Sequence, residues 1–214
     1  MSNFLTEHLI YRDEDFMVIH KPAGLLTVPG KTEDLQDCLI NRLLKIEKKT
    51  LLIHRLDRDT SGILVFALTR EGQKSISRQF QERQTDKLYQ ALVVGSLEGE
   101  GTVDVPVIYD PSRPPLHIAE PQHDKPALTH WQAVEQFEIA GQIVTRVKLT
   151  PITGRSHQLR VHMQYLGHPI VGDTLYAETP HQTLMPRLCL HAEFLSFTHP
   201  KTAQIVDFHC PVPF

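Results

Sequence analysis

The sequence predicts a mixed α+β fold in a single domain. Segments with the period-2 alternation of half-buried strands, such as Trp131–Phe137 and Ile143–Leu149, are interspersed with segments that have the 3–4 spacing of amphipathic helices. These segments do not follow the regular strand–helix–strand order of a doubly wound parallel sheet. No proline- or glycine-rich linker divides the 214 residues, so we expect one domain over residues 1–214.

The predicted strands are short apolar segments bounded by turn residues. Phe16–Ile19 ends at a turn-rich segment that runs from Lys21 to Gly30, and Ile63–Leu68 is apolar throughout, as in a strand buried on both faces. Further strands are predicted at Leu88–Val94, Trp131–Phe137, Ile143–Leu149, Leu190–Phe197 and Ile205–Phe208. The proline-rich segment Pro106–Pro126 is predicted to be a long irregular loop.

Three helices are predicted from the spacing of apolar residues. They cover Leu35–Lys48, Glu71–Gln84 and Ser156–Leu166. The last of them has a signal at each end, because Ser156 is a favourable N-cap and Gly167 stands where a glycine commonly follows a helix.

Composition excludes several classes of protein. With 41% hydrophobic and 22% charged residues the chain is not a disordered tail. Its longest apolar run, Ile63–Leu68, is far shorter than the roughly 20 residues of a membrane-spanning helix. The three cysteines form no CxxC pair, and Cys189 stands between two leucines as a core residue would. We therefore expect a cytoplasmic protein with reduced thiols rather than a disulfide scaffold.

Charge is distributed unevenly along the chain. The formal net charge of −3 argues against a general nucleic-acid coat protein, which is usually basic overall. The stretch Ile139–Gly172, however, contains four basic residues and three histidines but no acidic residue. Such a local positive field suits one anionic ligand at one site, although a solvated basic face balanced by acids elsewhere has the same pattern.

The densest polar cluster is HRLDRDTSG, residues 54–62, between two apolar segments. For Asp59 and the two hydroxyl residues after it, turn chemistry is a sufficient explanation, with side chains bonded to nearby backbone and Arg58 in solvent. Asp57 is different, because it follows a leucine in the alternation and stands among arginines. A carboxylate beside an arginine stays ionised, which suits a nucleophile or a general base.

A second cluster, TGRSHQLRVH at residues 153–162, covers the start of the last predicted helix. His157, Arg160 and Gln164 share a polar face of this helix beside its apolar stripe, so we expect Arg160 at the edge of the core. Arg155 precedes the helix, where backbone N–H groups without helical partners favour a phosphate.

Thirteen histidines raise the question of a metal site, but their spacing does not support one. His157 and His162 are five residues apart and lie on different helix faces, whereas the zincin pattern needs four. His162 and His168 are interpreted as ordinary, partly buried polar residues. The triplet at 191–193 matches only half of the nucleobase-deaminase signature, and Gly167–Gly172 has P-loop spacing with an aspartate in place of the lysine. From these patterns we expect no metal site.

The two clusters are part of a series of motifs that resembles the RluA-type pseudouridine synthases. HRLDRDTSG is similar to the central motif of that family. Its other motifs are similar, in the same order, to KPAGLLTVPG at 21–30, KLYQA at 87–91, TGRSHQLRVH at 153–162 and GHPIVGDTLY at 167–176. Together the matches cover the chain from about Asp15 to the C-terminus. Few residues precede Phe16, so the chain resembles the members that lack an S4 RNA-binding domain.

The resemblance implies an RNA-modifying isomerase with a mixed, largely antiparallel central sheet and flanking helices. Family members convert specific uridines of structured RNA to pseudouridine, including uridines of large-subunit ribosomal RNA and of a tRNA anticodon stem-loop. They use no metal or other cofactor. We therefore expect structured RNA as the partner, no membrane association, and a monomer.

The resemblance also implies roles for individual residues. Asp57 takes the place of the catalytic aspartate, and Tyr89 that of a tyrosine that stacks on the target base and helps to remove its C5 proton. Arg160 takes the place of an arginine that pairs with the catalytic aspartate, and Arg55 that of an arginine that fills the space left by the flipped base. Base flipping and RNA binding are expected of Arg55, Arg155, His157 and Gln158.

Two other functions remain open at this point. A non-catalytic RNA-binding module would keep the fold without needing Asp57, Tyr89 and Arg160 together. A glycoside hydrolase would use Asp57 and Asp59 as its carboxylate pair, held about 5–9 Å apart on opposite sides of a sugar. No comb of exposed aromatic residues for sugar stacking supports that second alternative.

Overall fold

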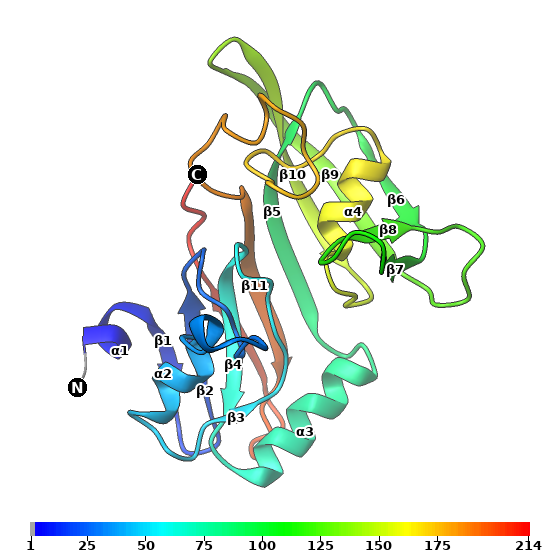
Figure 1. Cartoon of the computed structure of the whole chain (residues 1–214). Helices are drawn as coiled ribbons and strands as arrows, with labels where there is room; N and C mark the ends of the chain where they lie inside the picture. The colour runs from blue at the N-terminus through cyan, green and yellow to red at the C-terminus, as the bar shows by residue number, and fades with distance from the viewer. Residues whose placement is uncertain (1–2) are drawn as a thin grey trace. The chain divides into compact units, whose positions relative to one another are not determined.

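The structure is a computed structural model that describes residues 3–214, and its contacts divide the chain into two compact units (Figure 1). The first unit comprises Met1–Lys87 and Ala192–Pro213, and the second comprises Leu88–His191 and Phe214. The single domain over residues 1–214 stays a prediction.

The first unit is built on a sheet with the strand order β1-β2-β4-β11-β12, with β3 beside β4. Its strands are β1 (Leu9–Arg12), β2 (Phe16–Lys21), β3 (Leu51–Leu52), β4 (Ser61–Ala67), β11 (Leu190–Thr198) and β12 (Ile205–His209). β2 and β4 pair antiparallel from Phe16 opposite Ala67 to Lys21 opposite Gly62. Every residue of β4 is buried, as the continuous apolar run predicted.

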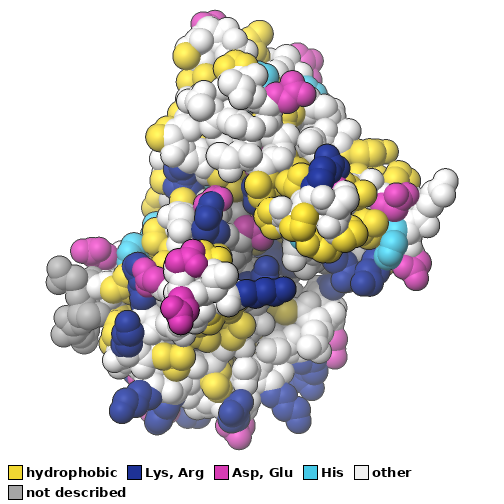
Figure 2. Space-filling model, in the orientation of Figure 1, with side chains coloured by type: hydrophobic (Ala, Val, Ile, Leu, Met, Phe, Trp, Pro, Cys, Tyr) yellow, Lys and Arg dark blue, Asp and Glu magenta, His cyan; other side chains and the backbone are white. Residues whose placement is uncertain are grey.

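Helix α3 (Arg70–Gln81) covers this core with a short apolar stripe. The Thr69 side chain caps its first turn by accepting a hydrogen bond from the Gly72 N–H, and Ile76 is fully buried. The helix ends three residues earlier than predicted, because Arg83 adopts a left-handed φ of 59°. Its outer side exposes basic residues, which Figure 2 shows in dark blue along this helix.

The helix predicted over Leu35–Lys48 is wrong in extent. The structure has a single 3-10 turn, η1 (Glu33–Leu35), and a six-residue helix, α2 (Leu39–Leu44), besides the N-terminal α1 (Asn3–His8). Cys38 is extended, and the next two N–H groups donate to the carbonyls of Leu26 and Thr27 instead of continuing a helix. Tertiary hydrogen bonds therefore override the apolar spacing.

The second unit contains an antiparallel sheet with the order β5-β10-β9-β6. Its strands are β5 (Asp86–Val94), β6 (Glu100–Asp104), β9 (Leu128–Ile139) and β10 (Gln142–Pro151). β9 and β10 form a hairpin closed by Ala140 and Gly141, which have φ values of 47° and 79°. Positive φ at both central residues matches the right-handed twist of paired strands, so this turn allows long, regular pairing.

Helix α4 (Gln158–Tyr165) packs on this sheet through Leu159 and Met163. The predicted glycine stop is confirmed: the Gly167 N–H donates to Gln164 O at 2.9 Å and the His168 N–H donates to Met163 O at 3.0 Å. These two bonds, with Gly167 at a φ of 83°, form a Schellman motif.

The start of this helix differs from the prediction. Ser156 is exposed, and the N-cap is His157, which has a left-handed φ of 57° and makes no side-chain cap bond. The Gln158 side-chain oxygen accepts a hydrogen bond from the Arg155 N–H at 3.0 Å, so a side chain of the first turn holds the segment that leads into the helix.

The loop predicted over Pro106–Pro126 contains two short strands, so this prediction is corrected. β7 (Val107–Tyr109) and β8 (His117–Ala119) pair antiparallel as a two-stranded sheet. They are held by a small apolar cluster that includes Val107, Val161 of α4 and Tyr176. Three residues per strand carry too little periodicity for the sequence to reveal them.

The α+β fold with a mixed, largely antiparallel sheet is confirmed. Among the described pairings, the parallel bridge between Leu26 and Cys38 is the exception to antiparallel pairing. The three cysteines are buried, and burial raises the pKa of the Cys189 and Cys210 thiols to about 11. Within residues 3–214, no helix has the length and apolar character to cross a membrane.

We expect Gly62→Ala to destabilise the first unit severely. Gly62 has a φ of 118°, and a Cβ there would lie 2.2 Å from the Ala192 carbonyl oxygen of β11. Gly24→Ala is the matched control, because Gly24 has a φ of 80° but no atom within 4 Å of its Cβ position. In thermal unfolding, the control should lose about 1–2 kcal/mol from backbone strain alone. Equal losses in the two variants would contradict the packing argument.

Candidate active site

The segment that carries Arg55 and Asp57 has no regular secondary structure, yet its backbone is fixed on both sides of Asp57. It lies between β3 and β4. Before Asp57, the buried Thr27 hydroxyl accepts a hydrogen bond from the Leu56 N–H at 3.2 Å and donates one to the Leu56 carbonyl at 2.7 Å. After it, the Arg58 carbonyl accepts a hydrogen bond from the Lys21 ammonium at 2.8 Å. Asp57 itself is half-buried.

Lys21 is a fully buried cation at the end of β2. Besides Arg58 O, its Nζ donates to the carbonyls of Pro22 at 2.9 Å and Leu25 at 2.7 Å. Three carbonyl acceptors replace much of the hydration that a buried ammonium loses. The KPAG segment, read from sequence only as a turn, is thereby bound to the loop that carries Asp57.

His54 anchors the start of the same loop. Its Nε2 accepts a hydrogen bond from the Val65 N–H of β4 at 3.2 Å, and its ring stacks on Phe80 of α3 with 4.4 Å between the ring centroids. Burial, with a smaller contribution from the charge of Lys87, lowers the pKa of His54 to about 3. The ring is therefore neutral at physiological pH and serves as an acceptor for the backbone.

The neighbouring polar residues of this loop are partly as predicted. Arg55 and Arg58 are exposed, and Thr60 is buried. Asp59 pairs with the Arg58 guanidinium at 3.0 Å instead of bonding to its own backbone, which corrects that part of the turn interpretation. An exposed pair of this kind contributes little to stability.

In the second unit, Arg160 is almost completely buried, deeper than the core edge predicted for it. Its Nε and Nη2 donate to the two carboxylate oxygens of Asp173 at 2.7 and 2.6 Å. The two side chains are 3% and 0% exposed, so this is a desolvated, bidentate ion pair. The pairing of Arg160 with Asp57 that the resemblance implies stays a prediction.

The polar face predicted for α4 is confirmed, and its three residues meet at Tyr176. The guanidinium carbon of Arg160 lies 5.0 Å from the centroid of the Tyr176 ring. His157 Nδ1 is 2.6 Å from the Tyr176 hydroxyl, and the Gln164 amide donates to the Tyr176 carbonyl at 3.2 Å.

Gln158 and Arg155, both predicted to bind RNA, have different surroundings. Gln158 is buried, and its amide makes four hydrogen bonds with Leu128, Thr129, Thr153 and Arg155. A glutamine amide has about four hydrogen-bonding positions, and these four contacts occupy them. Any contribution of Gln158 to RNA binding is therefore indirect, through the loop that its hydrogen bonds hold in place. Arg155 is exposed on that loop, and its Nε donates to the Pro126 carbonyl at 3.2 Å.

Tyr89 lies on β5, opposite Leu149 of β10, and is half-buried against the core of the second unit. Adjacent strand residues point to opposite faces of a sheet. The other face has a hollow of about 490 Å³, lined by Leu88, Lys148, Thr150 and His130 among others. Sequence reasoning did not find this hollow, because its lining comes from four strands that are separated in the sequence.

The interpretation of two histidines as ordinary, partly buried polar residues agrees with the structure, in which His168 is half-buried and His162 fully buried. The His162 ring is fully buried between Thr129 Oγ1 and the Val105 carbonyl, each at 2.9 Å, and burial lowers its pKa. His168 Nδ1 donates to the Val94 carbonyl at 2.8 Å. The His162 ring ties helix α4 to β9 and to the segment after β6, and the His168 ring ties the loop after α4 to β5.

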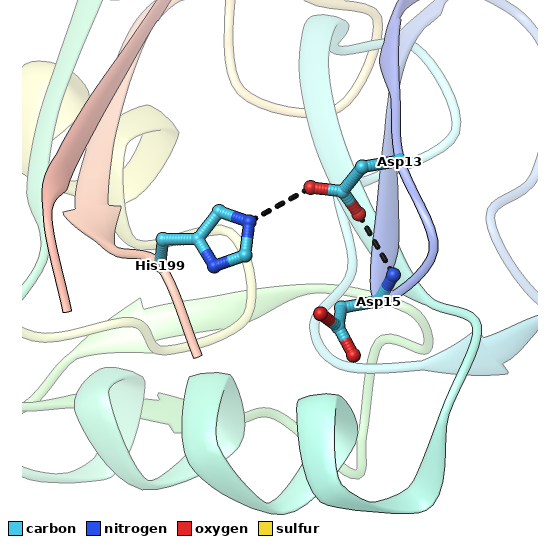
Figure 3. A group of neighbouring side chains, drawn as sticks. All are labelled: Asp13, Asp15 and His199. Atoms are coloured by element: carbon cyan, nitrogen blue, oxygen red, sulfur yellow. Dashed lines mark hydrogen bonds and ion pairs between the residues drawn. The ribbon is translucent and has the colours of Figure 1, made fainter. Parts of the chain in front are cut away.

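Within residues 3–214, one group of side chains has the spacing of a metal site: Asp13, Asp15 and His199 (Figure 3). The Asp13 carboxylate already accepts hydrogen bonds from the Asp15 and Phe16 N–H groups at 2.8 and 2.9 Å and from His199 Nε2 at 2.9 Å. These hydrogen bonds explain why the side chains of this group lie close together, as part of a stabilised turn in the first unit. The absence of a metal requirement stays a prediction.

The predicted site residues fall into two sets. Arg55 and Asp57 belong to the first unit, whereas Tyr89, Arg155, His157, Gln158 and Arg160 belong to the second. Within each unit, the structure adds residues that sequence reasoning missed: Lys21, Thr27, His54, Asp173 and Tyr176. All five stand in the motifs that carry the family resemblance, and those motifs were the signal from which they could have been identified.

Comparisons with known proteins agree with the motifs. A family model described as RNA pseudouridylate synthase matches residues 15–165. The dual-specificity RNA pseudouridine synthase RluA of Pasteurella multocida is 45% identical over 207 residues, which cover 96% of this chain and 93% of that protein. Its namesake from Escherichia coli is 44% identical over 208 residues, with the same coverage.

Solved structures are similar as well. Human RNA pseudouridylate synthase domain containing 1 matches with a TM-score of 0.82 and 34% identity, over 97% of this chain and 84% of that one. Human RNA pseudouridylate synthase domain containing 4 matches with a TM-score of 0.75 and 25% identity, over 98% and 90% of the two chains.

We expect Thr27→Val to loosen the loop around Asp57. Valine has a similar shape but leaves the buried Leu56 N–H and carbonyl without the hydroxyl, which should lower the free energy of unfolding by about 1–3 kcal/mol. Thr27→Ser, which keeps the hydroxyl, is the control. Hydrogen exchange at the Leu56 amide should be faster in the valine variant than in the serine variant, and unchanged exchange in both would contradict the anchoring role.

The low pKa of His54 predicts a pH-dependent stability. Below about pH 6.5 the unfolded chain binds a proton at this histidine, whereas the folded state does not until about pH 3. As the pH falls through this window, the free energy of unfolding should therefore decrease, by up to about 1.4 kcal/mol per pH unit. Urea unfolding at pH 7 and pH 5 should show a larger loss for the wild type than for His54→Gln. The same loss in both would rule out His54 as the cause.

Proposed function

Because the chain belongs to the RNA pseudouridylate synthase family, and within it to the RluA type, we propose that it modifies ribosomal RNA and a tRNA anticodon stem-loop. It is an RNA isomerase that converts uridine to pseudouridine. The names of the relatives support two kinds of RNA substrate, because they are described as dual-specificity enzymes.

The chemistry requires no net gain or loss of electrons. The N1–C1′ bond of uridine breaks, the uracil turns within the site, and a C5–C1′ bond forms. C5 then loses its proton to solvent while N1 takes one up, so product and substrate have the same composition. One ionised carboxylate can attack C1′ or C6, or take a proton from the ribose, and all three routes remain open.

The observation that carries this proposal is the fixed backbone on either side of Asp57. Thr27 holds the backbone of Leu56, and Lys21 holds the carbonyl of Arg58. The backbone position from which the Asp57 side chain extends is therefore fixed, although its loop has no regular secondary structure. A reacting group must be positioned within a fraction of an ångström to be effective. We assign Asp57 as the catalytic carboxylate and the exposed Arg55 as the residue that occupies the space of the flipped base.

The second unit supplies the remaining proposed groups. Tyr89 presents a half-buried ring for stacking on the uracil, and Arg160 supplies a positive charge whose orientation is set by Asp173. His157 and Arg155 contact the RNA from the start of α4, where an exposed arginine suits a phosphate. We propose that the protein acts in the cytoplasm as a monomer, without a cofactor.

The target uridine should lie in a loop of the RNA. An enzyme that works on a base inside an RNA must take that base out of the stack, which costs a few kcal/mol and least where pairing is absent. An isolated stem-loop with a loop uridine is therefore the substrate of choice for testing the function.

We expect Asp57→Asn to abolish pseudouridine formation while RNA binding stays within several-fold of the wild type. Asparagine keeps the shape of the side chain but carries no charge for nucleophilic or basic catalysis. The assay is release of tritium from C5-labelled uridine in a stem-loop, with binding measured in parallel. Asp59→Asn is the matched control and should retain substantial activity, because Asp59 pairs with the exposed Arg58.

Two outcomes would overturn this assignment. Turnover by the Asp57→Asn enzyme would remove Asp57 from catalysis. Complete loss of activity in a folded Asp59→Asn protein would show that the reaction needs both carboxylates rather than Asp57 alone. Release of tritium by the wild type would itself exclude both the glycoside hydrolase and the non-catalytic RNA-binding module.

A further inference from the structure

We propose that Tyr176 is a positioning residue that acts through two different groups: its hydroxyl orients His157 for RNA binding, and its ring, with Asp173, orients Arg160 for catalysis. This inference rests on the proposed function, which assigns those roles to His157 and Arg160. All the contacts that carry it lie within the second unit.

One carboxylate links Arg160 to Tyr176. Asp173 binds Arg160 with both oxygens, and its Oδ1 also accepts hydrogen bonds from the N–H groups of Leu175 at 2.9 Å and Tyr176 at 3.1 Å. The turn that carries Tyr176 is therefore fixed to the same atom that fixes the guanidinium. The Tyr176 ring then lies against Arg160, 5.0 Å from the guanidinium carbon, where a desolvated cation–π contact is strong.

The second link is to His157. This residue has a left-handed φ of 57°, which a non-glycine residue adopts only at a cost of about 1–2 kcal/mol. Its Nδ1 lies 2.6 Å from the Tyr176 hydroxyl, and the two rings meet edge to face. A strained backbone needs surrounding contacts to keep it in place, and the Tyr176 hydroxyl supplies one of them.

The Tyr176 hydroxyl is shared between His157 and β8. Its oxygen accepts a hydrogen bond from the His117 N–H of β8 at 2.9 Å and lies 2.6 Å from His157 Nδ1. The contact with Nδ1 sets the orientation of the imidazole ring. The same oxygen joins β8 to the first turn of α4.

The two links predict two separable defects. Removing only the hydroxyl in Tyr176→Phe frees the His157 ring but leaves an aromatic ring against Arg160. Removing the ring in Tyr176→Leu also takes away the surface that orients the guanidinium. Tyr165→Phe is the matched control, because Tyr165 is on the same helix and 53% exposed.

The experiment measures steady-state tritium release from the stem-loop for these variants, with thermal unfolding of each. We expect Tyr176→Phe to raise KM about 3- to 10-fold while kcat stays within about twofold. This is the pattern for losing one hydrogen bond that contributes equally to the enzyme–substrate complex and to the transition state. Tyr176→Leu should in addition lower kcat about 10-fold or more. Tyr165→Phe should match the wild type.

Several results would overturn the proposal. Tyr176→Phe kinetics equal to those of Tyr165→Phe would remove the role of the hydroxyl. A parallel fall of kcat and melting temperature, without a change in KM, would show a merely structural residue. If Tyr176→Leu does not fold, the KM effect of Tyr176→Phe alone decides.

A second measurement separates this inference from the proposed function. Nitrogen NMR of the imidazoles reports the protonation and hydrogen bonding of His157 without any turnover. Tyr176→Phe should shift the His157 Nδ1 signal and weaken binding of the stem-loop, whether or not the wild type releases tritium. Absence of tritium release with these effects present would reject the isomerase assignment alone, and absence of both effects would reject the role of Tyr176.

Discussion

The position of Asp57 depends on a buried ammonium group. Lys21 is removed from water at the end of β2, and it is stable there because its three N–H bonds meet the carbonyls of Pro22, Leu25 and Arg58. A neutral side chain of the same shape would leave these three carbonyls, of which that of Leu25 is buried, without their donor. The cation thus makes the conformation of an irregular loop as specific as that of a strand, and β2, held in register by β4, fixes the cation.

The second unit fixes its proposed catalytic cation in the opposite way. Arg160 is held by a carboxylate rather than by carbonyls, and Asp173 can do this because its oxygens also accept the N–H groups of the following turn. Breaking a buried pair by removing one partner leaves an uncompensated charge, so each member requires the other. A buried ion pair contributes little net stability, but it defines the direction of the guanidinium, which is what a catalytic role requires.

Sequence reasoning predicted the elements whose periodicity is long enough to read. β4, β9, β10 and α3 were found because their apolar residues repeat over six or more positions. The two strands of the predicted irregular loop were missed because they have three residues each, and the helix at Leu35 was overextended because carbonyls of a distant segment bind its first turn. The motifs identified Asp57, Tyr89 and Arg160 as candidates. No local pattern could show that Lys21 and Thr27 fix the backbone beside Asp57, or that Tyr176 packs against Arg160.

The start of α4 shows why such errors gather at a candidate site. By local rules Ser156 is the better cap, and a chain selected for stability alone would begin the helix there. The structure instead places His157 at the N-cap in a left-handed conformation without a side-chain cap, and the buried Gln158 holds the preceding segment through the Arg155 N–H. This arrangement brings the His157 ring to Tyr176 and keeps Arg155 and Ser156 on the exposed surface. Local preferences are often overruled where a side chain is held for a function, and the left-handed N-cap at His157 is consistent with the RNA contact proposed for it.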